Sequence, residues 1–366
     1  MKVALVHDYL SEFGGAERVL LALTEIYPKA PIYTAFYRKD LAAYERFKDK
    51  KIITSWAQKV PGFSKYLYSP LRFLAPNIWN SFTFEEYDVV ISSSSWYVTK
   101  GFEKKGKAKE ICYCHTPPRW LYGYRTSINW QKYWLVRVYG NIVGHFMRHY
   151  DFEAAQKVDE FVCNSEEVKK RIKKFYRREA KVIYPPVELP EVSGVKKEDY
   201  YFISSRIVGG KGLELAIKTA KKHKLKLKIA GQAAGYGGEY EKLRKMGGER
   251  VEWLGRVSDK QLAKLYAEAR AFLALAQQED FGITPVEANL MGTPVVAFKG
   301  GGYLETVVEG KTGVFFEEYS VKGLSRAISK LNRLKIRKED CIKQAKKFSK
   351  ERFKREITGF VLDKMR

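Results

Sequence analysis

Cysteine and histidine are scarce in this 366-residue sequence, which contains four cysteines and five histidines. No C-x-x-C pair occurs, and the spacing of the cysteines fits neither a zinc site nor a disulfide framework. Two of them, Cys112 and Cys114, alternate along an expected strand. We therefore expect no metal centre and no disulfide framework, and a cytoplasmic location in which thiols stay reduced.

Long hydrophobic runs are also missing. No stretch approaches the roughly 20 apolar residues that a membrane-spanning helix needs. The N-terminus enters an expected strand at once, so no signal peptide is expected. Low-complexity segments are absent, and a hydrophobic content of 45% suits packed globular domains. At this length, two domains of ordinary size are expected.

Acidic residues are outnumbered by basic ones, 42 to 67, which gives a net charge of +25. Such a charge attracts polyanions, whether nucleic acid, anionic lipid or phosphorylated substrates. Lysine-rich helix faces that are simply solvated, or a heat-adapted source, would explain it equally. Because the sequence carries no helix-turn-helix, zinc-finger or RRM signature, no nucleic-acid partner is expected.

The first half of the sequence alternates short apolar strands with helical segments. Residues 16–27, for example, carry apolar side chains at helical spacing. This alternation predicts a parallel sheet covered by helices on both faces, with ligands at the C-terminal strand ends. The expected strands are 2–7, 32–36, 88–95, 110–115, 160–164 and 181–184.

A proline-containing polar stretch, 187–199, follows and is interpreted as an interdomain linker. The sequence thus predicts an α/β fold with two Rossmann-like, doubly wound domains, 1–186 and 187–345. Strands expected in the second domain are 200–205, 226–231, 251–255, 271–276, 294–298 and 313–316.

One turn in the second half combines several functional signals. The strand 271–276 stops at polar residues, and Thr284, Pro285 and Glu287 then match the T-x-x-E capping box of a helix start. A helix N-terminus attracts anions, and Glu279 would lie beside such an anion. That setting suits a ligand with both phosphates and hydroxyls. Alternatively, Glu287 is only a capping residue and Glu279 only a solvated one.

Three further glycine turns precede expected helices. Arg206 and Lys211 bracket a glycine turn at a helix that starts at residue 213, a good setting for a diphosphate. The spacing is not that of a Walker P-loop. The other two are 300–302, before a helix with Glu305, and Gly14-Gly15, which would let the backbone approach a ligand closely or form an ordinary turn.

His115 follows a strand directly and precedes a stiff Pro-Pro pair. At a strand's C-terminal edge it could donate a hydrogen bond to a substrate hydroxyl or phosphate, or serve a structural turn.

Two segments, 56–84 and 130–150, are rich in aromatic and basic residues. They suit a membrane interface, or ordinary helix packing with basic side chains that reach solvent. His145 and His149 could bind a metal at their i, i+4 spacing, but a shared helix face is the simpler interpretation.

Several of these groups together resemble glycosyltransferase family 4, whose members are retaining enzymes of the GT-B fold. The resemblance covers nearly the whole chain. It rests on Arg206 with Lys211, the E-x7-E pair Glu279 and Glu287, the turn with Glu305, and Gly14-Gly15. Residues 7–9, 13–18 and 113–119 are similar to WbaZ-type mannosyltransferases within it, except at Pro118, where a methionine or similar residue is expected.

The resemblance implies a nucleotide-sugar donor in a central cleft between the two domains. By position, Arg206 and Lys211 would neutralise the diphosphate, and Glu287 would hold the ribose. Glu279 and the amides around residues 281–283 (Phe281, Gly282 and Ile283) would hold the sugar. His115 would contact the sugar, and Gly15 would let the diphosphate approach. The last helix, about 346–366, would return to the N-terminal domain.

The expected reaction is metal-independent. Breaking the sugar–phosphate bond leaves a diphosphate anion, which fixed positive charge stabilises. No Asp-x-Asp pair is present to hold a metal, so Arg206 and Lys211 would supply that charge. We expect a retaining mannosyltransferase that uses GDP-mannose and acts on a lipid-linked or polysaccharide acceptor, in contact with an anionic membrane.

Three alternatives remain from the sequence. A UDP-sugar could replace GDP-mannose, because nothing in the sequence reads the base. A UDP-sugar 2-epimerase of the same fold would need further acid/base carboxylates and histidines, and histidine is scarce. A basic polyanion-binding protein would explain the charge but not the aligned glycine turns.

Overall fold

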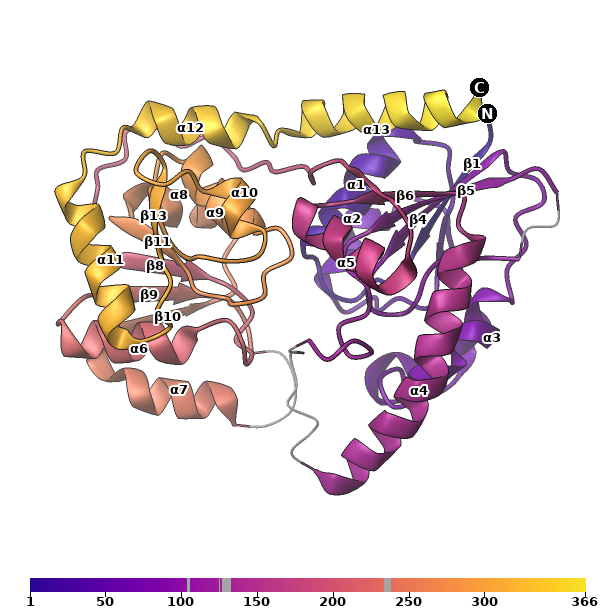
Figure 1. Ribbon diagram of the computed structural model, residues 1–366, viewed down its shortest axis with the longest axis horizontal. Helices are drawn as coiled ribbons and strands as arrows, with labels where there is room; N and C mark the ends of the chain where they lie inside the picture. The colour runs from indigo at the N-terminus through magenta and orange to yellow at the C-terminus, as the bar shows by residue number, and fades with distance from the viewer. Residues whose placement is uncertain (104–105, 125, 127–132, 234–237) are drawn as a thin grey trace. The chain divides into compact units, whose positions relative to one another are not determined.

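The computed structural model describes the chain except for residues 104–105, 125, 127–132 and 234–237. Two compact units are present. Unit 1 comprises Met1–Tyr124, Gln131–Pro186 and Lys350–Arg366, and unit 2 contains Val187–Ser349. Each unit is built on one parallel sheet with helices on both faces (Figure 1).

Unit 1 contains a seven-stranded sheet in the order β3-β2-β1-β4-β5-β6-β7. All neighbouring strands pair in parallel. All six strands expected here lie within two residues of their predicted bounds, and β2 and β7 each end two residues early. The three-residue β3 was not predicted. The strands are β1 (Val3–His7), β2 (Ile32–Thr34), β3 (Ile52–Thr54), β4 (Val89–Ser94), β5 (Lys109–Cys114), β6 (Glu160–Cys163) and β7 (Lys181–Val182).

The core of unit 1 lies on both sides of this sheet because side chains alternate along each strand. In β1, Ala4 and Val6 join one buried cluster, whereas Val3 and Leu5 join the cluster on the other face. The covering helices are α1 (Gly15–Ile26), α2 (Ala42–Phe47), α3 (Ala75–Trp79), α4 (Trp134–Lys157), α5 (Glu166–Tyr176) and α13 (Lys350–Met365), with short turns at Trp56–Lys59, Phe63–Leu67 and Arg72–Leu74.

The C-terminal helix α13 belongs to unit 1 and packs on α1. Its residues Phe353, Ile357 and Val361 enter the buried cluster of this face. Lys350 and Lys354 both pair with Glu25 of α1, at 3.0 and 2.6 Å. Both ends of the chain therefore lie in the same unit (Figure 1).

Unit 2 contains a six-stranded parallel sheet in the order β10-β9-β8-β11-β12-β13. All six strands were expected from the sequence. They are β8 (Tyr201–Ser204), β9 (Leu227–Ala230), β10 (Val251–Gly255), β11 (Ala271–Ala274), β12 (Val295–Phe298) and β13 (Gly313–Phe316). The helices are α6 (Leu213–Lys222), α7 (Glu239–Gly247), α8 (Asp259–Glu268), α9 (Ile283–Leu290), α10 (Tyr303–Thr306), α11 (Val321–Arg333) and α12 (Lys338–Lys346), with a short turn at Gly248–Arg250.

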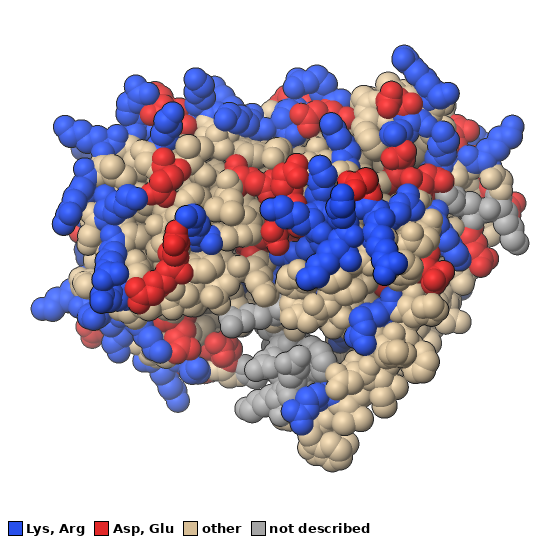
Figure 2. All heavy atoms as spheres, in the orientation of Figure 1, with Lys and Arg blue, Asp and Glu red and all other residues tan. Residues whose placement is uncertain are grey.

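The aromatic and basic segments divide between core and surface. In 56–84, Phe63, Trp79 and Phe84 are buried, whereas Tyr66 is 65% exposed. The part of 130–150 that the structure describes comprises Tyr133 and the first two thirds of α4, where the apolar side chains are mainly exposed. This end of α4 forms a largely uncharged surface in Figure 2. The four cysteines are buried and none forms a disulfide.

Candidate active site

Three of the glycine turns singled out in the sequence lie at one edge of unit 2. They follow β8, β11 and β12, which are neighbours in the sheet. Because the strands are parallel, their carboxyl ends meet at the same edge, where ligands of such sheets bind. The topology thus brings Arg206, Lys211, Glu279 and residues 300–302 to a common region.

An ion pair joins two of these turns. The Lys211 ammonium lies 2.8 Å from Oε2 of Glu279, and the Tyr303 hydroxyl lies 3.5 Å from the same oxygen. The side chains of Lys211 and Glu279 keep 30% and 19% of their exposure, so both still reach solvent. Burial and then the Glu279 charge raise the pKa of Tyr303 well above its usual value, which keeps the phenol protonated.

Glycine is required where the turn after β12 meets the turn after β11. A Cβ on Gly301 would lie 2.3 Å from the Glu279 carbonyl oxygen, and one on Gly302 would lie 2.3 Å from Cα of Phe281. The Gly302 N–H donates to the Glu279 carbonyl at 3.0 Å. The glycine turn after β12 thus fixes the backbone that carries Glu279.

The helix start after β11 differs from the prediction. Helix α9 begins at Ile283, and its N-cap is Gly282 with φ of 91°, a residue without a capping side chain. The predicted capping box of Thr284 and Glu287 is therefore wrong. The left-handed conformation of Gly282 starts the helix early, so Thr284 already lies in the first turn. Phe281 is buried, with its ring 5.4 Å from that of Phe348.

Glu287 lies on α9 and is 2% exposed. The Tyr266 hydroxyl of α8 donates to its Oε2 at 2.8 Å, which fixes the orientation of the carboxylate. A carboxylate buried at a helix's second turn is not explained by capping. Its burial with a polar partner is compatible with a role in a ligand site.

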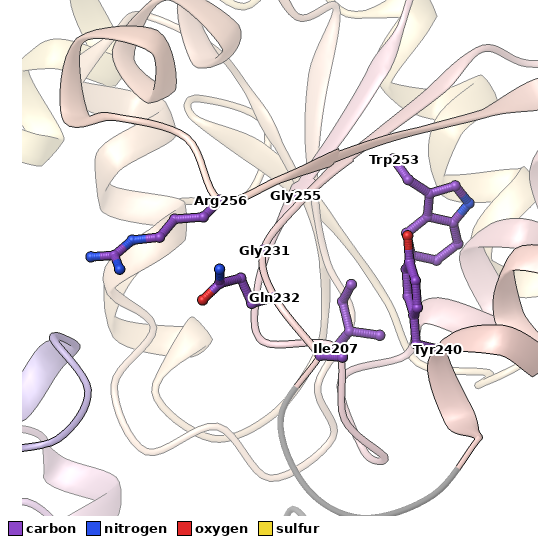
Figure 3. Close-up of a pocket in the computed structure, with 8 residues that line it drawn as sticks. Ile207, Gly231, Gln232, Tyr240, Trp253, Gly255 and Arg256 are labelled. Carbon is purple, nitrogen blue, oxygen red and sulfur yellow. The ribbon is translucent and has the colours of Figure 1, made fainter. Parts of the chain in front are cut away.

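A cavity of about 450 Å³ opens at the ends of β8, β9 and β10 in unit 2. Its lining residues are Ile207, Gly231, Gln232, Ala233, Tyr240, Trp253, Gly255 and Arg256. In Figure 3 the side chains of Gln232 and Arg256 lie on one side and those of Tyr240 and Trp253 on the other. The two rings meet edge to face at 5.3 Å. The cavity combines an aromatic wall with an amide and a guanidinium.

The turn after β8 connects this cavity to the ion pair along the chain. Ile207 lines the cavity, its neighbour Arg206 is exposed, and Lys211 follows four residues later. Helix α6 begins at Leu213, as predicted, with Gly212 as its N-cap at φ of 76°. A Cβ on Gly212 would lie 2.4 Å from that of Leu275, so the turn packs closely on the end of β11.

In unit 1, the structure places Gly14 and Gly15 at the start of α1, with Gly14 as N-cap. The Gly14 N–H donates to Oε2 of Glu17 at 2.8 Å. The other carboxylate oxygen, Oε1, lies 3.3 Å from Nε2 of His7. The double glycine is thus the first turn of a helix whose glutamate reaches the end of β1.

His115 lies just beyond β5, is 8% exposed, and has its ring against Tyr113 at 5.1 Å. Its Nε2 is 2.8 Å from the Ser93 hydroxyl, and its carbonyl accepts from the Asn164 amide at 2.9 Å. Ser93 therefore orients the ring of His115, and Asn164 orients its backbone.

Sequence reasoning missed Asp8, whose carboxylate holds the loop after β4. It accepts hydrogen bonds from the Trp96 N–H at 2.6 Å, from the Ser95 hydroxyl at 2.8 Å and from the Thr99 hydroxyl. The signal was present, because Asp8 follows a strand in the His7-Asp8-Tyr9 group.

Among the described residues, no metal-site group forms around His145 and His149 of α4. No group of three His, Cys, Asp or Glu side chains suited to a metal ion occurs in the part of the chain that the structure describes. Nor does any helix in that part have the length and apolarity needed to cross a membrane.

Two family models match the chain. The model described as Glycosyltransferase Family 4 matches residues 13–190, and the one described as Glycosyl transferases group 1 matches residues 188–348. Together they span both units. These matches support a glycosyltransferase of family 4.

Curated relatives are distant. An uncharacterized glycosyltransferase of Methanocaldococcus jannaschii is 27% identical over 56% of this chain and 60% of its own length. The alpha-1,3/1,6-mannosyltransferase ALG2 of Dictyostelium discoideum is 32% identical over 38% of this chain and 29% of its own length. The chain thus spans less than two thirds of these two relatives. The ALG2 of Mus musculus is 25% identical over 83% of this chain and 81% of its own length.

Solved structures share the fold. Anabaena HepE in complex with UDP superposes with a TM-score of 0.70 at 18% identity, over 99% of this chain and all of that one. Sucrose-phosphate synthase from Thermosynechococcus elongatus gives a TM-score of 0.76 at 13% identity over 99% of both chains. The fold is GT-B, as expected.

Proposed function

We propose that this chain, a protein of the GT-B fold whose halves match two glycosyltransferase models, is a retaining, metal-independent glycosyltransferase. Its proposed donor is GDP-mannose and its proposed acceptor a lipid-linked molecule or polysaccharide. The observation that carries the proposal is the Lys211–Glu279 pair at 2.8 Å, at the sheet edge that also holds the 450 Å³ cavity.

The leaving group explains the cations. When the sugar–phosphate bond breaks, negative charge develops on the diphosphate, and fixed cations that stabilise it lower the barrier. Lys211 and Arg206 supply two such charges from the turn after β8. In this proposal they do the work for which other enzymes use a metal.

The remaining parts of the donor have candidate positions in unit 2. A nucleobase suits the cavity, since Tyr240 and Trp253 offer an apolar wall and Gln232 and Arg256 offer polar groups. Glu287 is the proposed ligand of the ribose hydroxyls. Glu279, with the amides of residues 281–283, is the proposed holder of the sugar, because its carboxylate is fixed by Lys211 and Tyr303 yet still reaches solvent.

Mannose is favoured by the likeness to ALG2, which is named as a mannosyltransferase. A UDP-sugar is the second candidate, because HepE, which shares the fold, was solved with UDP. Retention of configuration rests on the family resemblance.

Thermal unfolding with nucleotides tests the donor. A ligand that binds only the folded protein stabilises it by about 2.7 kcal/mol at a concentration of 100 Kd. We expect GDP to raise the unfolding temperature by the same amount with Mg²⁺ and with chelator. In a separate assay with acceptor present, we expect the protein to release GDP from GDP-mannose. A shift with UDP alone would show that the donor is a UDP-sugar rather than GDP-mannose. A shift that needs Mg²⁺ would overturn metal independence, and no shift with any nucleotide would overturn the enzyme proposal.

A contact with anionic membrane is proposed for the α4 apolar face. This face consists of exposed side chains in the first half of α4 and just before it: Tyr133, Trp134, Leu135, Val136, Val138, Tyr139, Ile142 and Phe146. Exposed apolar patches of this kind mark interaction sites. The helix carries no acidic residue before Asp151, whereas Arg137 and Arg148 are exposed, so its charge suits anionic lipid.

Vesicle sedimentation tests this contact. We expect the protein to pellet with phosphatidylglycerol-containing vesicles and the variant Trp134→Ser/Leu135→Ser/Phe146→Ser to stay in the supernatant. The matched control Leu304→Ser/Leu334→Ser/Leu362→Ser removes three other exposed leucines, which are 55%, 38% and 50% exposed, and should pellet like the parent. Equal pelleting of both variants would refute the membrane contact at α4.

A further inference from the structure

A chain of hydrogen bonds in unit 1 links the glycine turn of α1 to His115. Glu17 Oε1 lies 3.3 Å from His7 Nε2, His7 Nδ1 lies 3.0 Å from the Ser93 hydroxyl, and that hydroxyl lies 2.8 Å from His115 Nε2. His7 and Ser93 are 2% and 1% exposed, so the middle of the chain is shielded from water. Two sequence groups separated by about a hundred residues are thereby connected.

Counting protons gives the chain a direction. An ionised carboxylate can only accept, so a neutral His7 carries its proton on Nε2 and Nδ1 is an acceptor. The Ser93 hydroxyl has a single proton, which it then donates to His7. Its oxygen must accept from His115, which places the proton of a neutral His115 on Nε2 and leaves Nδ1 as an acceptor.

We propose that Glu17, acting through His7 and Ser93, determines which ring nitrogen of His115 carries the proton. Glu17, His7 and Ser93 are positioning residues in this scheme. His115 is the group that the resemblance assigns to the sugar, and that part of the inference rests on the proposed function. The tautomer itself is a property of unit 1 and does not depend on it.

The state of Glu17 supports this direction. Burial alone would raise its pKa, but the hydrogen bond from His7 and the backbone N–H groups of Glu17 and Gly14 lower it below the ordinary value. Glu17 is therefore an acceptor at neutral pH. One of its oxygens serves the Gly14 N–H and the other serves His7, so the two ends of the carboxylate have different partners.

This difference makes Glu17→Gln a sharp test. The Gly14 N–H requires an oxygen at 2.8 Å, so the new NH₂ group must face His7 Nε2. Nε2 then becomes an acceptor, His7 carries its proton on Nδ1 and donates to Ser93, and Ser93 donates to His115 Nε2. The proton of His115 moves to Nδ1. One isosteric change should invert the tautomer of a residue three hydrogen bonds away.

The measurement is ¹⁵N NMR of the full-length protein labelled in histidine, at pH 8, above the ordinary pKa of histidine. Only five histidines contribute. We expect His115 to be protonated on Nε2 in the parent and on Nδ1 in Glu17→Gln. In Ser93→Ala we expect a mixture of the two, and in Ser93→Thr, which keeps the hydroxyl, the parent state.

A matched control exists in unit 2, where the Ser325 hydroxyl lies 2.7 Å from His223 Nε2. Ser325→Ala should change the signals of His223 and leave those of His115 untouched. Protonation of His115 on Nδ1 in the parent, or the same His115 tautomer in the parent and Glu17→Gln, would overturn the proposal.

Activity supplies a separate readout. We expect Glu17→Gln to lower kcat for sugar transfer about tenfold, the effect of one misdirected hydrogen bond, with nucleotide affinity unchanged. If the parent binds no nucleotide, the proposed function is refuted, while the tautomer result still stands. A tautomer inversion without any effect on kcat would remove the His115 orientation from the reaction.

Discussion

Nζ of Lys211 lies 2.8 Å from Oε2 of Glu279, and the two residues come from the turns after adjacent strands β8 and β11. The lysine both balances the carboxylate and offers positive charge at the sheet edge. Because neither side chain is fully buried, a ligand can reach the pair.

Replacing Lys211 by alanine should therefore lower kcat for sugar transfer by about 10²- to 10³-fold, the usual effect of losing one group that stabilises a developing anion. The matched control is Lys330→Ala, which breaks the exposed 2.6 Å pair with Glu309 and should keep full activity. Steady-state kinetics measure both. Equal kcat in Lys211→Ala and the parent would remove Lys211 from the reaction.

Gly282→Ala should destabilise unit 2 more than Gly310→Ala. Both glycines have positive φ, 91° and 73°, so both variants lose about 1–2 kcal/mol to the left-handed backbone. A Cβ on Gly282 would also lie 2.8 Å from the Tyr303 ring, whereas one on Gly310 meets nothing within 4 Å. We expect an extra loss of about 1–3 kcal/mol for Gly282→Ala, measured by urea unfolding. Equal losses would contradict the packing of Tyr303 on this turn.

The buried ion pair of Lys100 and Asp151 predicts a large effect on stability. Both residues are 0% exposed, and the Tyr122 hydroxyl also donates to Asp151, at 2.7 Å. Lys100→Met leaves a buried carboxylate without its cation and should cost about 3–5 kcal/mol in urea unfolding. Lys48→Met, which breaks an exposed 3.0 Å pair with Glu45, should change stability by less than about 1 kcal/mol. A small effect of Lys100→Met would contradict the burial of the pair.

Glu17 predicts a pH dependence. Its pKa in the folded protein is lower than the ordinary 4.5, so the unfolded chain binds more protons at acidic pH. The stabilisation from its ionised form is complete above about pH 4.5 and is lost as pH falls through the folded value. The unfolding temperature of Glu17→Gln should lie below that of the parent at pH 7, and the gap should narrow below pH 4.5. A gap that is constant with pH would show that the charge of Glu17 does not stabilise the fold.

Much of the architecture follows from local patterns. The apolar strands 251–255 and 313–316 were predicted with their observed bounds because a short apolar run between turn residues indicates a buried strand. The turn with Arg206 and Lys211 was predicted at the start of α6 because Gly212 stands immediately before a helical pattern. For the same reason the sequence placed Gly14 and Gly15 at the start of a helix.

Other features depended on contacts that no local pattern contains. The start of α9 was predicted two residues late, because the left-handed backbone of Gly282 caps the helix before Thr284 and no local pattern reveals that conformation. The three-residue β3 carries too few apolar residues for a pattern to stand out. Whether the aromatic side chains of 56–84 and α4 are buried or exposed was decided by which helices pack on the sheet.

The sequence by itself determined two α/β domains and the residue types at their strand ends, since helical and strand periodicities are properties of short segments. Only the tertiary structure decided which of those residues meet. The parallel pairing of β1, β4 and β5 brings His7 and Ser93 opposite each other and places His115 beside them. Sheet register is fixed by the burial of whole strands rather than by any single residue, and therefore the partners of His115 became visible only in the folded chain.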